Sequence, residues 1–122
     1  MTHYFFVHNS VKIICAYESL TYSYLQSKQY CKAIDNYTGL SELLENKQDL
    51  NYFHQAMYMR TYENRGWLYD ELGEHEKAEE YYNKGIKICE KTLELNPDFK
   101  EVRECLDRII ENKNKINSLT NK

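Results

Sequence analysis

The sequence predicts an all-α protein, and three observations support this fold class. Apolar residues recur at intervals of three and four along almost the whole chain, which is the spacing of one helix face. The 122 residues include four glycines and one proline, fewer than the turns of a sheet-rich domain need. Hydrophobic residues make up 42% and charged residues 29% of the chain, a balance typical of a soluble domain with a core. We expect a single domain at this length.

Polar breaks between the apolar patterns predict five helices. The first runs from about Val11 to Ser27 with Asn9 or Ser10 as its N-cap, so that residues 1–10 form a separate N-terminal segment. Gly73 is a natural helix end, because glycine readily adopts the left-handed conformation of a C-cap. Further helices are predicted at about 30–45, 50–72 with Asp49 as a cap, 75–95, and 98–116 with Pro97 near its first turn, followed by a flexible tail at 117–122. Short breaks make consecutive helices antiparallel.

The first two predicted hairpins share an internal repeat. A shift of 45 residues places residues of the first hairpin on identical residues of the second. The identical pairs include Tyr17/Tyr62, Glu18/Glu63, Tyr24/Tyr69, Lys32/Lys77, Ala33/Ala78 and Tyr37/Tyr82. Aromatic side chains at such positions fill the groove between two helices, and a small alanine lets the two backbones approach.

The segment from Tyr62 to Tyr82 resembles a tetratricopeptide (TPR) repeat. It has the family's glycine in the first helix at Gly66, the Leu-Gly turn at Leu72-Gly73 and the second-helix alanine at Ala78. Arg65 stands where the family prefers an apolar residue, so either it extends to the surface or the local packing differs. The 45-residue shift exceeds the usual ~34 residues and indicates longer helices.

The resemblance is weaker in the first hairpin, where Thr21 replaces the glycine and Ser27-Lys28 replaces Leu-Gly. It covers roughly residues 12–116 and implies a TPR-like helical domain at 11–116. The implied fold is a right-handed α-solenoid of two TPR-like antiparallel hairpins and a C-terminal capping helix. The charged residues Glu101, Glu104, Asp107, Arg108 and Glu111 make the polar side of that cap.

The resemblance implies a protein–protein interaction module that holds a peptide or a partner helix in a concave groove. Tyr22 and Trp67 stand 45 residues apart and are either groove anchors or residues that pack against neighbouring helices. Glu63 and Asp70 belong either to the groove or to a solvated face. The candidate groove residues are Glu18, Tyr22, Gln26, Arg60, Glu63, Asn64, Trp67 and Asp70.

Other functions receive less support from the sequence. The clamp with which some TPR domains bind a C-terminal carboxylate is not supported, because the first helix offers Glu18 and Tyr22 in place of Lys and Asn. One alternative is a structural, self-associating unit of a larger assembly, with homo-oligomer contacts through the apolar patch Tyr4–Val7. Another is a helical bundle that encloses a small ligand or a metal.

No motif predicts catalysis, a cofactor or a metal site. The histidines show no pairing at helical spacing, and no glycine-rich phosphate loop or nucleophile motif is present. We expect the cysteines Cys15, Cys31, Cys89 and Cys105 to be small buried residues, with a regulatory thiol or a metal ligand as the alternative. The net charge of −3 argues against nucleic acid as a partner. No membrane span or signal peptide is apparent, so we expect a cytoplasmic protein.

Overall fold

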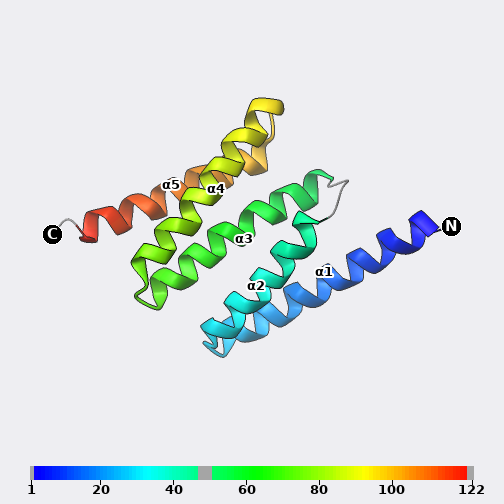
Figure 1. The fold of residues 1–122 in the computed structure, drawn as a ribbon, viewed down its shortest axis with the longest axis horizontal. Coiled ribbons are helices and arrows are strands. Elements are labelled where there is room, and N and C mark those ends of the chain that lie inside the picture. The colour runs from blue at the N-terminus through cyan, green and yellow to red at the C-terminus, as the bar shows by residue number, and fades with distance from the viewer. Residues whose placement is uncertain (1, 47–50, 121–122) are drawn as a thin grey trace.

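The protein forms five α-helices that follow one another across the molecule, as the computed structural model shows (Figure 1). The structure describes residues 2–46 and 51–120, with side chains at 12–46 and 51–118, and this part of the chain contains no strand. The helices are α1 (Thr2–Gln26), α2 (Tyr30–Glu45), α3 (Tyr52–Glu71), α4 (His75–Leu95) and α5 (Lys100–Thr120). The predicted all-α class is therefore confirmed.

The helix boundaries agree with the prediction to within two residues, except at the start of α1 and the end of α5. The predicted start at Val11 is wrong, because α1 already begins at Thr2 and runs through Asn9 and Ser10. No glycine or proline interrupts this stretch, and a single Asn or Ser costs a helix only a few tenths of a kcal/mol. Likewise α5 continues past Ile116 to Thr120.

The caps of the helices differ partly from the prediction. Asp49 lies outside the described residues, and Asn51 caps α3 instead, because its side chain accepts a hydrogen bond of 2.8 Å from the backbone N–H of His54. Pro97 lies in the turn before α5 rather than in its first helical turn.

Consecutive helices pack side by side, and α3 is the centre of the array. It contacts α2, α4 and α5, whereas α1 contacts α2 alone among the helices of the described chain. Figure 1 shows that consecutive helices run in opposite directions. The arrangement is that of a helical repeat solenoid, in which each hairpin packs on the next.

The buried apolar residues form one larger and two smaller clusters. The larger cluster joins α3, α4 and α5 around Tyr82, Val102 and Ile109, none of which exposes any of its surface. The smaller clusters hold the first hairpin to α3. One contains Ile14, Leu40, Leu44 and Met57, and the other contains Ala33, Ile34 and Leu68. Most of the core therefore lies in the C-terminal half.

The cysteines divide between the core and the surface, and all four are free thiols. Cys89 and Cys105 are buried as expected, but the prediction is wrong for Cys15 and Cys31, which are exposed on the outer sides of α1 and α2. A hydrogen bond with Cys89 and burial raise the pKa of Cys105, so its thiol stays protonated at neutral pH. The buried pair contributes to packing between α4 and α5.

Candidate partner-binding site

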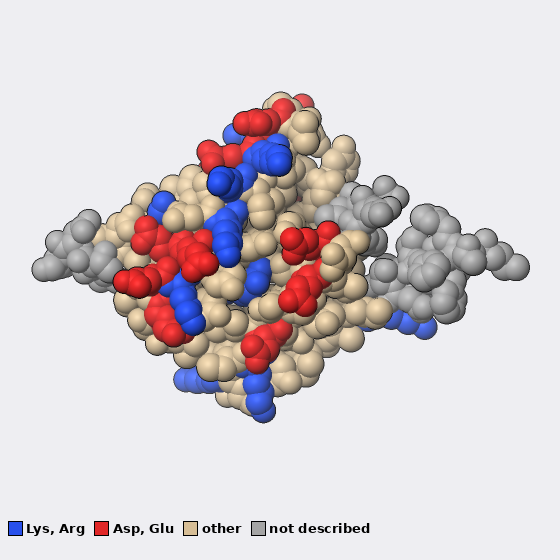
Figure 2. All heavy atoms as spheres, viewed as in Figure 1, with Lys and Arg blue, Asp and Glu red and all other residues tan. Residues whose placement is uncertain are grey.

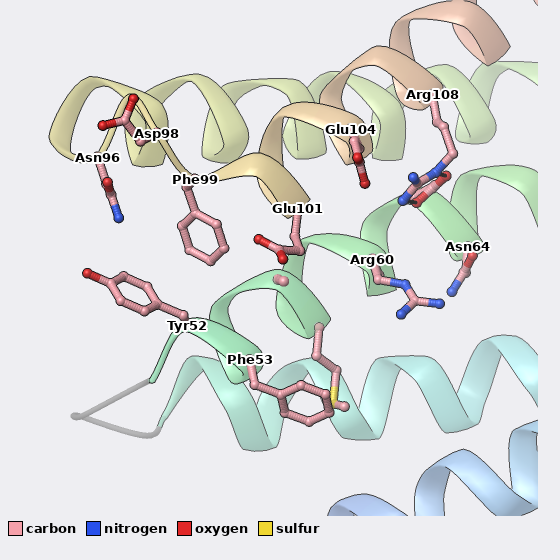
Figure 3. A pocket seen from close by; sticks show the side chains of 13 residues that line it. Tyr52, Phe53, Arg60, Asn64, Asn96, Asp98, Phe99, Glu101, Glu104 and Arg108 are labelled. Carbon is pink, nitrogen blue, oxygen red and sulfur yellow. Dashed lines mark hydrogen bonds and ion pairs between the residues drawn. The ribbon is translucent and has the colours of Figure 1, made fainter.

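A pocket of about 810 Å³ lies between α3 and α5. We call it the α3–α5 pocket. Aromatic side chains lie at one end of it, where the rings of Tyr52 and Phe99 meet edge to face with their centroids 5.0 Å apart (Figure 3). Its lining residues are Tyr52, Phe53, Ala56, Met57, Arg60, Glu63, Asn64, Asn96, Asp98, Phe99, Glu101, Glu104 and Arg108.

A smaller pocket, of about 250 Å³, lies where α1 and α2 face α3. We call it the α1–α3 pocket. It includes the exposed ring of Tyr22 and the half-buried ring of Tyr37. Its lining residues are Glu18, Thr21, Tyr22, Leu25, Tyr37, Leu40, Met57, Arg60, Thr61 and Asn64.

One stripe of α3 contributes to both pockets. Met57, Arg60 and Asn64 line both of them, and Phe53 continues the stripe toward the start of the helix. These positions are three or four residues apart, so they lie one above another along a single helix face. The two pockets are therefore adjacent sections of the surface that runs along α3.

An ion pair lies at the far end of the α3–α5 pocket, between the buried carboxylate of Glu63 and the half-exposed side chain of Arg108. Arg108 donates to both carboxylate oxygens of Glu63, from Nε at 2.7 Å and from Nη2 at 3.1 Å. The Sγ–H of Cys105 also donates to this carboxylate. The hydrogen bond to Glu63 raises the pKa of Arg108 above its already high value. Each of these two charges is thus neutralised by the other, and Glu63 is only 8% exposed.

The α1–α3 pocket is organised around the hydroxyl of Tyr37. Burial raises the pKa of Tyr37, while the nearby charge of Arg60 and a hydrogen bond with Asn64 act in the opposite direction. The phenol is consequently neutral at physiological pH. It presents a polar atom at the boundary of the two pockets.

The structure brings together five of the eight residues that the sequence singled out. Glu18, Tyr22, Arg60 and Asn64 line the α1–α3 pocket, and Arg60, Glu63 and Asn64 line the α3–α5 pocket. Glu63 is buried in its ion pair and is no longer a free groove carboxylate.

The other three predicted residues line neither pocket. The indole of Trp67 meets the ring of Tyr30 edge to face at 6.2 Å and is 41% exposed. Asp70 accepts a hydrogen bond of 2.7 Å from His75 Nδ1 and so ties the end of α3 to the start of α4. Gln26 is exposed at the last residue of α1.

Sequence reasoning missed the aromatic end of the α3–α5 pocket. The last helix was predicted to be a cap, so its role as one side of a pocket opposite α3 was not predicted. The signals that point to this end are the adjacent aromatic residues Tyr52 and Phe53 at the start of α3 and Phe99 two residues after Pro97. Tyr52 and Phe53 expose 65% and 64% of their surface, which is unusual for large apolar side chains.

Neither pocket contains a constellation for metal binding. Within residues 12–46 and 51–118, no three His, Cys, Asp or Glu side chains are placed to hold a metal ion. No helix there combines the length and the apolar character that crossing a membrane requires. Figure 2 shows acidic and basic side chains interspersed over one face of the molecule.

The stacked antiparallel hairpins and the repeat of 45 residues define a helical repeat protein. Residues 60–92, which comprise most of α3 and α4, match the tetratricopeptide repeat family. The match and the five-helix architecture together support a TPR-like family assignment for this chain. TPR repeats generally mediate interactions between proteins. No curated protein and no solved structure gives a significant match.

Proposed function

We propose that the protein is an interaction module that binds a segment of another protein along α3, across the α3–α5 and α1–α3 pockets. The observation that carries this proposal is the aromatic end of the larger pocket, where Tyr52 and Phe53 are mostly exposed beside Phe99. Exposed aromatic side chains in a pocket of this size are typical anchors for a partner. Such binding requires no cofactor and no catalytic group.

The polar residues of the shared stripe give the surface its specificity in this proposal. Arg60 and Asn64 lie where the two pockets meet, and Tyr22 and Glu18 extend the surface onto α1. A bound segment that crosses α3 therefore contacts apolar rings at one end and hydrogen-bonding groups in the middle. The free cysteines of the described chain suit a reducing compartment, and we infer that the cytoplasm is the site of action.

Affinity capture with single variants tests the proposal. The whole chain serves as bait in a lysate of the source cells, and captured proteins are quantified by mass spectrometry. We expect Phe53→Ser to lower capture of the same partners about tenfold, because a central aromatic anchor contributes ~1.4 kcal/mol or more. Tyr22→Ala should give a smaller loss, and Trp67→Ala, which changes neither pocket, should give none.

Leu95→Ser is the matched control for Phe53→Ser. Leu95 is 86% exposed at the end of α4 and lies outside both pockets, so its replacement removes exposed apolar surface elsewhere. Circular dichroism melting curves establish that every variant is folded. Equal capture by Phe53→Ser and the unchanged chain would overturn the proposed function.

A second candidate function is self-association through the outer side of α1. Ile13 and Leu20 lie two turns apart on α1, and each exposes 44% of its surface. The opposite edge of the array is α5, whose outer side is charged. The side chains of the patch Tyr4–Val7 lie outside the described set. Sedimentation at high micromolar concentration tests this function. The unchanged chain should form a dimer, and Leu20→Ser should weaken it.

A further inference from the structure

The apolar part of the α3–α5 pocket is lined by side chains from α3 and from the turn before α5. Phe53 and Met57 come from α3, and Phe99 precedes α5 on the opposite wall. Phe99 is 6% exposed and belongs to the core, whereas Phe53 is 64% exposed. Figure 3 shows the rings of Tyr52 and Phe99 facing each other at one end of the pocket, with the ring of Phe53 set apart from them along α3. An apolar side chain in this part of the pocket would cover the exposed ring of Phe53.

The charged part of the same pocket is acidic. Glu101 and Glu104 extend from α5 toward α3, and Asp98 lies just before that helix (Figure 3). Arg108 is neutralised by Glu63, which leaves Arg60 as the unpaired cation of the lining. Two carboxylates, those of Glu101 and Glu104, therefore face α3 near one guanidinium, whereas the carboxylate of Asp98 points away from the pocket (Figure 3).

These carboxylates are largely uncompensated within the protein. Asp98 and Glu101 form no ion pair or hydrogen bond with another side chain of the described residues. Glu104 pairs with Lys100 at 3.8 Å, but both side chains are more than half exposed, and such pairs contribute little. A cation from a ligand would meet free acceptors next to the apolar end of the pocket.

We propose that the segment bound in the α3–α5 pocket carries a lysine or arginine beside a large apolar residue. This inference rests on the proposed function and names the partner class of that site. The apolar side chain packs on Phe53, Met57 and Phe99, and the cation pairs with Glu101, which extends toward α3 (Figure 3). An acidic segment is disfavoured, because its carboxylates would approach the like charges of Glu101 and Glu104.

Binding to defined peptide pools tests the proposal. The probes are pools of synthetic 12-residue peptides with a fixed central Leu or Phe, followed by a fixed Arg, Gln or Glu and otherwise random positions. We expect the Arg pool to bind about fivefold more tightly than the Gln pool, as one partly exposed ion pair would give. The Glu pool should bind more weakly still. The preference should shrink as salt is raised, because the charges lie at the surface.

Charge reversal on α5 supplies the matched variants. Glu101→Lys should abolish or reverse the preference for the Arg pool. Glu111→Lys makes the same change on the same helix but outside the pocket lining, where Glu111 pairs with Lys115 at 3.5 Å, and it should leave the preference unchanged. Melting curves establish that both variants are folded.

The outcomes separate this inference from the proposed function. If the three pools bind equally and Phe53→Ser abolishes their binding, the basic preference is overturned while segment binding stands. If no pool binds the unchanged chain better than it binds Phe53→Ser, segment binding in this pocket is overturned as well. A preference for the Arg pool that Glu111→Lys removes as strongly as Glu101→Lys would also refute the assignment, because general charge would then account for it.

Discussion

The two hairpins share a sequence pattern but hold their helices together by different chemistry. In the second hairpin, Gly66 has no side chain, and the ring of Tyr82 lies directly over its backbone. A Cβ atom added at Gly66 would overlap that ring. Tyr82 is fully buried as a result. The contact between α3 and α4 is thus an aromatic ring packed on bare backbone.

In the first hairpin, Thr21 occupies the position equivalent to Gly66 and is 4% exposed. Its hydroxyl donates to the carbonyl oxygen of Tyr17 at 2.7 Å and accepts a hydrogen bond from Asn36. Tyr37, the equivalent of Tyr82, is only half-buried and lines the α1–α3 pocket. Because Thr21 has a side chain where Gly66 has none, α1 and α2 meet through hydrogen bonds. Tyr37 does not pack on bare backbone there and faces the α1–α3 pocket instead.

The largest effect is expected for Gly66→Ala. The added methyl group must displace the ring of Tyr82, which is enclosed by the larger core cluster, and overpacking of this kind costs ~3 kcal/mol. Thr21→Ala should cost only ~1 kcal/mol, since it removes hydrogen bonds but leaves Asn36 bonded to the carbonyl of Tyr17. Chemical denaturation of both variants measures the difference. A smaller loss for Gly66→Ala than for Thr21→Ala would show that the ring can move aside.

Arg65 and its repeat equivalent Leu20 give the next largest contrast. Arg65 is 5% exposed, and its guanidinium lies over the rings of both Tyr62 and Tyr81, at 4.6 and 4.8 Å from their centroids. Its Nη2 donates to the hydroxyl of Ser41 at 2.9 Å and so joins α3 to α2. Arg65→Ala should lower the free energy of unfolding by ~2 kcal/mol.

Leu20→Ala should cost less than ~1 kcal/mol, because that side chain is 44% exposed. Arg65→Lys is the informative control. It keeps the charge but loses the planar group that stacks on two rings, so it should recover less than half of the loss. Thermal unfolding of the three variants decides the matter, and an Arg65→Ala variant as stable as Leu20→Ala would contradict the contrast.

Sequence reasoning succeeded where local signals suffice. The spacing of apolar residues and the turn residues fixed α2 and α4 to the residue, and the 45-residue repeat identified the hairpins. Of the two alternatives left open for Arg65, extension to the surface is wrong and altered packing is confirmed. The polar face predicted for α5 is exposed, as its charged residues show.

It failed where the outcome depends on contacts between distant elements. Glu63 was predicted to lie in the groove or on a solvated face, and Arg108 on the polar side of the cap. Their ion pair was missed because a pattern within one helix does not reveal a partner on another. The α3–α5 pocket was missed for the same reason, since its walls are 45 residues apart in sequence. The extension of α1 was missed because Asn9 and Ser10 are good caps as well as tolerable helix residues.

A third contrast follows the repeat interval across three helices. Glu18, Glu63 and Arg108 are spaced 45 residues apart on α1, α3 and α5. The pair between α3 and α5 has opposite charges, whereas Glu18 and Glu63 have like charges, and α1 and α3 do not pack against each other. Arg108→Ala should cost ~1–2 kcal/mol, because it leaves the mostly buried carboxylate of Glu63 unpaired.

Glu18→Ala is the matched change at an exposed carboxylate and should alter stability by less than ~0.5 kcal/mol. Urea unfolding at low and high salt distinguishes the two positions, because salt screens an exposed charge more than a partly buried pair. Equal losses at both positions would mean that the ion pair does not hold α5 to α3.

The smallest expected effect concerns the turns at the ends of the two hairpins, and it is a gain in stability. Gly73 ends the α3–α4 turn with φ of +79°, and Lys28, 45 residues earlier, has φ of +57°. The two turns also share a hydrogen bond. The N–H of Gln29 donates to the carbonyl oxygen of Tyr24, and the N–H of Glu74 donates to the carbonyl oxygen of Tyr69. Both turns thus need the left-handed conformation, which strains a residue with a Cβ atom. Lys28→Gly should therefore stabilise the protein by ~0.5 kcal/mol. This is the relief of strain less the cost of the entropy that glycine adds to the unfolded chain.

The reverse change completes this comparison. Gly73→Lys introduces the strain that Lys28 already has, and no atom outside the turn would contact the new Cβ, so it should cost ~1 kcal/mol through the backbone alone. The double variant Lys28→Gly/Gly73→Lys should fall within ~0.5 kcal/mol of the sum of the single changes, because the turns belong to separate hairpins. Differential scanning calorimetry measures all three. A Lys28→Gly variant that is less stable than the unchanged chain would show that the Lys28 side chain stabilises its turn by more than the strain it introduces.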